Sequence, residues 1–308
     1  MGVTQTGSYD ATGSRSPQWW PSRYGQDDLL GAANELTSER TLAALQLPRE
    51  GRVLELAQTL QTGVPAYPPR MWNQHVLAHG ALEGILVGKG GSDLSYFEEQ
   101  VSQTYHIGCH IDGLGHIGIG GLFYNGHHYD EFYDPNGLKM YGAEQMRPWV
   151  CRGVCLDMTA LEGTEMLPGG YVITPEHLEQ ACERQDVEVR AGDAVMLHTG
   201  WARMWNADGD RYGTEEPGGG WDAAHWLTDR RVSLVACDNW AFEVIPFEQP
   251  QSMFAVHQHL LAETGTYILE NAKTQEIVDA RASEFLFCAA VPKVKGATGG
   301  MAAPVAVI

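Results

Sequence analysis

Hydrophobic and polar positions recur along the chain with two different periods, which predict helices in some segments and strands in others. The clearest helical pattern follows Thr174, a residue suited to a helix N-cap, and Pro175, which suits the first helical position. Beyond them, Leu178, Ala181 and Cys182 form an apolar stripe. This segment is therefore predicted to be a helix that packs one face on a core.

Other segments carry similar signals, so the chain as a whole predicts a mixed fold. Helical patterns cover 39–47, 221–231 and 257–264. Patterns typical of strands cover 52–60, 192–200, 232–239, 266–271 and 284–292. No internal repeat or long linker divides the chain, so residues 23–308 are predicted to form one α/β domain. Residues 1–22, which are rich in Gly, Ser and Thr, are predicted to form a flexible arm.

Composition and charge narrow the classes of partner. The 20 Lys and Arg residues against 39 Asp and Glu residues give a formal net charge of −19, which repels nucleic acid and anionic membrane surfaces. No apolar stretch approaches the roughly 20 residues of a membrane span, and the N-terminus lacks the apolar core of a signal peptide. We therefore expect a cytoplasmic protein that acts on a small molecule.

The chemistry of the chain is concentrated in residues 103–134, where His106, His110, Asp112 and His116 lie within eleven residues and are interleaved with glycines. Glycine is unfavourable in helices, so an extended or looped backbone is predicted. Side chains alternate between faces in an extended chain, so the even spacings send all four polar groups to one side. The isoleucines at odd positions are then expected to face the core: Ile107, Ile111 and Ile117.

A straight strand would separate His106 from His116 by roughly 33 Å at about 3.3 Å per residue, so the chain is predicted to bend. The glycines between Asp112 and His116 are expected to permit that bend. Imidazole nitrogens and a carboxylate oxygen suit zinc or manganese and leave positions open for water and substrate. Hydrogen-bonded structural histidines and tight turns are the alternative interpretation, but four such groups on one face favour a metal site.

The same segment carries a family resemblance. His106-Ile-Gly-Cys-His110-Ile-Asp112-Gly-Leu-Gly-His116 resembles the signature His-x-Gly-Thr-His-x-Asp-x-Pro-x-His of cyclase-family metal-dependent hydrolases, which include kynurenine formamidases, isatin hydrolases and cyclic imide hydrolases. Cys109 and Leu114 are the departures, and neither removes a ligand. Further similar stretches, such as GQDDLLGAANELT and the closing KGATGGMAAPVAVI, extend the resemblance over most of the chain.

The resemblance implies roles for individual residues. His106, His110 and Asp112 would bind a divalent ion, Zn²⁺ or Mn²⁺, and His116 would be the catalytic acid and base. His257 and Glu270 match the distal partners of the family, which serve the substrate or, with Asp112, hold a second ion, so one or two ions per subunit are expected. His259 competes with His257 for this position. If the segment is helical, residues two apart diverge by about 200°, so only one of the two can face the site; we choose His257.

The implied fold is a swivelling β/β/α fold, with a mixed β-barrel-like sheet flanked by helices. The implied assembly is a homodimer or homotetramer. The implied reaction is hydrolysis of a C–N bond in a small cyclic amide or imide or an aryl formamide. The alternatives are a lactone or ester hydrolase, a cyclase or dehydratase acting on a small carbonyl metabolite, and a metal-binding protein without turnover.

Aromatic residues near the motif are the candidates for the substrate pocket: Trp72, Phe123 and Tyr124. Trp72 belongs to a proline-rich loop of the kind that frames sites. No Arg or Lys lies within the motif, which disfavours a strongly anionic substrate, although Arg70 lies close to Trp72 in the chain.

Overall fold

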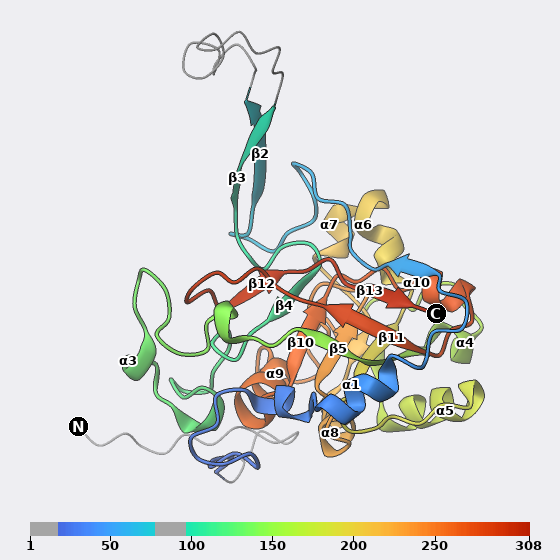
Figure 1. The fold of residues 1–308 in the computed structure, drawn as a ribbon. Helices are drawn as coiled ribbons and strands as arrows, with labels where there is room; N and C mark the ends of the chain where they lie inside the picture. The colour runs from blue at the N-terminus through green and yellow to red at the C-terminus, as the bar shows by residue number, and fades with distance from the viewer. Residues whose placement is uncertain (1–17, 78–96) are drawn as a thin grey trace, which may run out of the picture.

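A computed structural model describes residues 18–77 and 97–308 and shows a mixed nine-stranded sheet that curls into a half-barrel, with helices at its flanks (Figure 1). From one edge to the other the strands are β1 (Val53–Glu55), β13 (Val305–Val307), β11 (Glu284–Ala289), β5 (Trp149–Asp157), β7 (Ala194–His198), β9 (Leu234–Cys237), β10 (Tyr267–Glu270), β4 (His110–Asp112) and β12 (Gly299–Met301). The predicted α/β class and the barrel-like sheet flanked by helices are confirmed.

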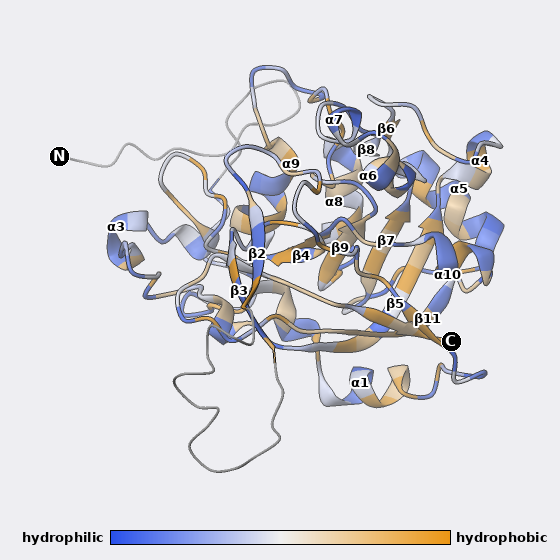
Figure 2. Ribbon diagram, turned by 90° about the horizontal axis from the view of Figure 1, so that it is seen from above, coloured by the Kyte–Doolittle hydropathy of each residue, from blue (hydrophilic) through white to orange (hydrophobic). Residues whose placement is uncertain are grey.

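The centre of the sheet is parallel and its two sides are antiparallel. Strands β5, β7, β9 and β10 run parallel to one another, whereas β4 pairs antiparallel with both β10 and β12. Every residue of β7 and β9 is buried, as expected for parallel strands covered on both faces. Figure 2 shows this apolar character in β5 and β7. The predicted strands at 192–200, 232–239, 266–271 and 284–292 are confirmed within a few residues at each end.

Helices α1, α5 and α8 lie together below the sheet in Figure 1. Thr37 caps α1 by accepting from the Arg40 backbone N–H, and His177 Nδ1 accepts from the Thr174 N–H at the start of α5. Leu178 and Ala181 of α5 are buried, as its apolar stripe predicts. The regular helices are α1 (Ser38–Ala44), α3 (Tyr129–Phe132), α4 (Thr159–Glu162), α5 (Pro175–Gln185), α6 (Met204–Ala207), α7 (Gly209–Tyr212), α8 (Trp221–Asp229), α9 (Ala255–His257) and α10 (Gln275–Asp279).

Short helical turns fill several connections. Four are 3₁₀ turns: η1 (Gly31–Glu35), η2 (Tyr124–Gly126), η3 (Ala143–Gln145) and η4 (Trp201–Arg203). The fifth, η5 (Gln258–Thr264), continues α9 as a π-helix. The helix predicted over 257–264 is therefore present with a wider turn, because its hydrogen bonds reach one residue further than in an α-helix.

Two strand pairs lie outside the main sheet. Strands β2 (Trp72–Leu77) and β3 (Glu98–Gln103) form a hairpin that projects from the body in Figure 1, and β6 (Val172–Ile173) pairs with β8 (Gly218–Gly219). The strand predicted over 52–60 is limited to β1, three residues long. Most of the predicted arm, residues 1–17, lies outside the described residues. Among the residues that the structure describes, no helix has the length and apolar character needed to cross a bilayer.

Candidate metal centre

Strand β4 lies between β10 and β12 and brings three of the predicted site residues together. His110 is directly opposite Glu270 on β10, so their side chains share a face of the sheet, and Asp112, two residues further along β4, shares it as well. His110 Nε2 lies 3.2 Å from Glu270 Oε2 and 3.3 Å from Asp112 Oδ1. The even spacing of the motif thus has the structural basis expected from the sequence.

His106 and His116 reach the same place from the loops on either side of β4. His106 Nδ1 lies 2.6 Å from Asp112 Oδ1, and His106 Nε2 lies 2.8 Å from Thr298 Oγ1. The rings of His106 and His116 stack with their centroids 3.8 Å apart. Ten residues separate the two histidines in the chain, so the predicted bend is present.

The bend uses glycine at a different position from the one predicted. The left-handed backbone lies before the strand, at Gly108 (φ +59°), and not between Asp112 and His116. Gly113 is needed for space, because a Cβ atom there would lie 2.8 Å from the carbonyl oxygen of Thr298. Only a residue without a side chain allows the loop of Thr298 to approach the strand this closely.

His257, at the end of α9, completes the cluster. Its Nε2 lies 3.0 Å from Glu270 Oε1 and 3.8 Å from Asp112 Oδ2. Its Nδ1 lies 2.6 Å from Glu243 Oε1, which also accepts from the His257 backbone N–H at 3.1 Å. His259 points elsewhere, with its Nε2 2.9 Å from Thr228 Oγ1. Of the two competing histidines, the structure therefore brings only His257 to the cluster.

The donor atoms of this cluster fit a metal ion. His110 Nδ1 lies 2.8 Å from the Gly108 carbonyl, which can only accept, so Nδ1 carries the hydrogen and Nε2 has a lone pair. That lone pair faces two carboxylates, and His110 Nε2, Asp112 Oδ2 and Glu270 Oε2 are all buried without a hydrogen-bond partner. Acceptors facing one another in a buried site are stabilised by a positive charge between them, either a proton on His110 Nε2 or a metal ion.

Two overlapping sets of donors are close enough to share an ion: His110, Asp112 and Glu270 in one, and His106, Asp112 and His116 in the other. Asp112 belongs to both sets, the position expected of a bridging ligand. The trio predicted from the motif, His106, His110 and Asp112, has both imidazoles within 3.3 Å of the same oxygen, Asp112 Oδ1.

The electrostatics of the cluster favour a cation at its centre. Burial alone would raise the pKa of Asp112, but the neighbouring His116 and His106 hold it well below its usual range. Burial alone would lower the pKa of His110, but the adjacent carboxylates of Asp112 and Glu270 raise it to about 9. His116 differs, because burial lowers its pKa to about 3. His116 is thus a neutral imidazole at neutral pH, with the capacity to accept a proton.

A small hollow lies beside His106. It is lined by the proline-rich loop that includes Tyr67 and Arg70, by the Tyr212–Gly213 turn, and by Trp240 and Asn271. The Tyr67 and Trp240 rings stack 5.1 Å apart at 14°. Burial lowers the pKa of His106 and His116, and the charge of Arg70 acts in the same direction on both. The Arg70 guanidinium is therefore close to the cluster as well as to the hollow.

The aromatic residues named from the sequence do not line this hollow. Tyr124 is fully buried, and its hydroxyl donates to Asp28 Oδ2 at 2.7 Å. Phe123 packs edge-on against Phe132, and Trp72 begins strand β2. The proline-rich loop was expected to frame the site and does, but through Tyr67 and Arg70. Sequence reasoning missed Trp240 and Glu243, which reach the site through tertiary contacts and have no local signal.

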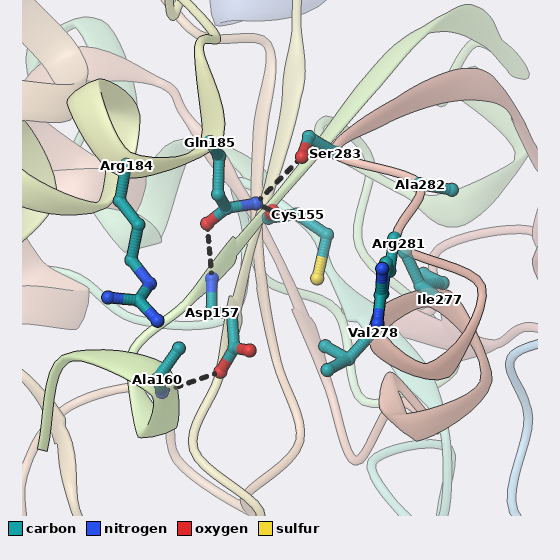
Figure 3. A pocket seen from close by; sticks show the side chains of 10 residues that line it. All are labelled: Cys155, Asp157, Ala160, Arg184, Gln185, Ile277, Val278, Arg281, Ala282 and Ser283. Carbon is teal, nitrogen blue, oxygen red and sulfur yellow. Dashed lines mark hydrogen bonds between the residues drawn. The ribbon is translucent and has the colours of Figure 1, made fainter. Parts of the chain in front are cut away.

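A second, larger hollow lies away from the cluster, between the ends of β5, α5 and α10 (Figure 3). Arg184 and Arg281 flank it, and Gln185 fixes its wall. The Gln185 amide donates to the Cys155 carbonyl and to Ser283 Oγ, and its oxygen accepts from the Asp157 N–H. Since the buried polar groups of this wall already satisfy one another, we assign the hollow no chemical role.

Comparison with known proteins identifies the family of the chain. The family model of Cyclase matches residues 54–244, more than half of the chain, so the protein belongs to the Cyclase family, and the resemblance seen in the motif is confirmed. A crystal structure of a novel cyclase has 28% identity and a TM-score of 0.83, covering 93% of this chain and 96% of its own. No curated protein matches the chain.

Two isatin hydrolases are similar in fold. Isatin hydrolase A from Ralstonia solanacearum has 19% identity and a TM-score of 0.63, covering 86% of this chain and 93% of its own. An isatin hydrolase bound to the product analogue thioisatinate has 16% identity and a TM-score of 0.61, covering 89% of this chain and 99% of its own.

Proposed function

We propose that this protein is a metal-dependent hydrolase that cleaves a C–N bond in a small cyclic amide or imide or an aryl formamide. The observation that carries the proposal is the set of buried, unpartnered donor atoms on His110, Asp112 and Glu270, with a neutral imidazole, His116, beside them. Family membership supports it, as do the folds of the isatin hydrolases.

His106, His110 and Asp112 would hold a zinc or manganese ion, and Asp112, His257 and Glu270 have the donors for a second. When bound, such an ion lowers the pKa of water towards 7 and polarises a carbonyl group. The chain itself fixes the orientation of these ligands. The Gly108 carbonyl holds the His110 ring and Glu243 holds the His257 ring, and groups of this kind raise the basicity of a ligand and fix its tautomer.

His116 supplies the proton transfer in this proposal. Its imidazole would accept the proton that an attacking water molecule loses and then donate it to the leaving nitrogen, since an imidazole can act as both base and acid. The stacked His106 ring, 3.8 Å away, limits how His116 can turn. Water attack followed by protonation of the leaving nitrogen breaks the C–N bond and gives a carboxylic acid together with an amine, or with an amide when the substrate is an imide.

The stacked Tyr67 and Trp240 rings beside His106 favour a flat substrate, because an aromatic face packs well against another flat ring. Arg70 also lines the hollow beside His106, and its positive charge favours a substrate that carries a carboxylate. An aryl formamide with a carboxylate on its ring has both features.

A substrate panel tests the proposal. Isatin, N-formylkynurenine, succinimide, phthalimide and a lactone would each be incubated with the wild-type protein, with His116→Asn and with the control His127→Asn. His127 is a suitable control because it lies on the surface and pairs with Glu131 at 2.7 Å. We expect turnover of at least one nitrogen substrate, reduced at least ~100-fold by His116→Asn at unchanged metal content and unaffected in the control.

Turnover of the lactone alone would replace the amide with an ester as the substrate class. Full activity of His116→Asn would overturn the role of this histidine, and a metal-loaded protein that hydrolyses none of the panel would overturn the proposal.

A further inference from the structure

A second cluster of metal-ligating side chains lies outside the site described above, between α8 and η5. His225 comes from α8, and His259 and Glu263 come from η5. One ligand atom of each residue lies within 4.8 Å of the others. His257, two residues before His259, points to Glu270 in the metal centre. The two clusters therefore share one helical segment and face different sides of it.

Glu263 carries an unsatisfied oxygen in this cluster. Its side chain is only 9% exposed, and its Oε2 lies 2.7 Å from His259 Nδ1. The other oxygen, Oε1, is buried and has no hydrogen-bond partner. A buried carboxylate oxygen without a donor is costly, and a bound cation would remove that cost.

The histidine tautomers fit the same interpretation. His225 Nδ1 lies 3.0 Å from the Trp221 carbonyl, so Nδ1 donates and Nε2 is left with a lone pair. His259 Nε2 lies 2.9 Å from Thr228 Oγ1, and that hydroxyl donates onward to the His225 carbonyl at 3.2 Å. His259 Nε2 then donates to the hydroxyl, which leaves a lone pair on Nδ1 beside Glu263. Each ring is thus anchored through one nitrogen, the usual arrangement of a metal-binding histidine.

The geometry requires one adjustment. The His225 and His259 rings are stacked 3.8 Å apart at 17°, so their lone pairs run nearly parallel. Two lone pairs converge on one ion only if a ring turns. His225 is the ring that can turn, because it is partly exposed whereas His259 is 5% exposed, and in turning it would give up its Nδ1 bond to the Trp221 carbonyl. The partial exposure of His225 also gives an ion a route from solvent.

We propose that His225, His259 and Glu263 form a second metal site, which binds a transition-metal ion of the zinc class through two imidazole nitrogens and a carboxylate oxygen. This donor set suits Zn²⁺ better than Mg²⁺ or Ca²⁺, which prefer oxygen. An ion there would join α8 to η5, the segment that continues directly from His257. The site stabilises the fold; none of its three residues lines the hollow beside His106.

The test measures Zn²⁺ per chain after equilibrium dialysis, together with the Zn²⁺-dependent rise in Tm. The starting protein is His110→Ala, which removes one ligand of the metal centre, and Glu263→Gln or His225→Gln is added to it. The matched control is Glu131→Gln. Glu131 pairs with His127 at 2.7 Å over the same four-residue spacing as Glu263 and His259, but this pair belongs to none of the possible metal-binding groups among the described residues.

We expect His110→Ala to retain about one equivalent of Zn²⁺ and to gain several degrees in Tm at saturating metal. The bound Zn²⁺ and the rise in Tm should both disappear when Glu263→Gln or His225→Gln is added, and both should persist when Glu131→Gln is added. Equal Zn²⁺ content with and without Glu263→Gln would overturn the proposal. No Zn²⁺ bound by folded His110→Ala would also overturn it. Neither result depends on hydrolytic activity, so the proposed function is tested separately.

Discussion

His110 Nε2 and Glu270 Oε2 face each other at 3.2 Å across the antiparallel pair β4 and β10, and neither atom has a hydrogen-bond partner. The two residues are 160 positions apart in the chain, and the register of this strand pair is what brings them together. A buried nitrogen lone pair facing a buried carboxylate oxygen is a stable arrangement when a cation lies between them. The sheet itself therefore builds the candidate metal centre.

Glu243 is predicted to act as a positioning residue through His257. Its Oε1 accepts from both the ring Nδ1 and the backbone N–H of His257. Glu243→Ala should lower kcat about 10- to 100-fold, the usual effect of losing the group that orients a metal-site histidine, with little change in KM. Glu243→Gln keeps an oxygen that can accept and should restore most of kcat. If both variants had wild-type kcat, Glu243 would have no positioning role.

Arg70 is predicted to recognise an anionic group on the substrate. The matched probes are N-formylanthranilate, which carries a carboxylate, and formanilide, which lacks it. Arg70→Met should raise KM for N-formylanthranilate about 10-fold, as expected for loss of a charge-assisted hydrogen bond, and leave formanilide unchanged. Arg281→Met, at the separate hollow of Figure 3, serves as the control. An equal change for both probes would show that Arg70 acts on structure and not on charge.

Glu35 is predicted to make stability depend on pH. Burial alone would raise its pKa, but hydrogen bonds from Tyr24, Arg231 and Arg40 lower it. A lowered pKa in the folded state means that the stabilisation is present above the unfolded value, near 4.3, and is lost as the pH falls through the folded value.

Glu35→Gln should therefore reduce the free energy of unfolding by about 1–3 kcal/mol at pH 7, because Gln has no charge and keeps only one of the two accepting oxygens. The loss should shrink as the pH is lowered below 4. Urea unfolding at several pH values measures this difference. A loss that stayed constant with pH would show that the charge of Glu35 contributes nothing.

The clustering of the motif residues could be predicted from the sequence because their spacing is local. His106, His110, Asp112 and His116 lie in one short segment, and alternation along a strand places the middle two on one face. Thr298, Glu243 and Trp240 reach the same region from distant segments. No periodicity in the chain encodes those contacts, because they depend on how the loops pack.

Element boundaries were predicted less well than element types. The strand within the motif is only three residues long, since turns on both sides carry the other ligands. The π-helical form of η5 was not predicted, because apolar spacing does not distinguish it from an α-helix. That segment nevertheless separates His257 from His259, as the helical geometry used for the prediction requires.

The most direct test of the metal centre is the metal content per chain by elemental mass spectrometry. Wild-type protein, His110→Ala and the surface control His127→Ala would be purified without chelator. We predict that the wild type and His127→Ala each retain at least one more equivalent of zinc or manganese per chain than His110→Ala retains. We also predict that His110→Ala loses its hydrolytic activity. Equal metal content in all three proteins would contradict the account and leave His110, Asp112 and Glu270 as a structural cluster.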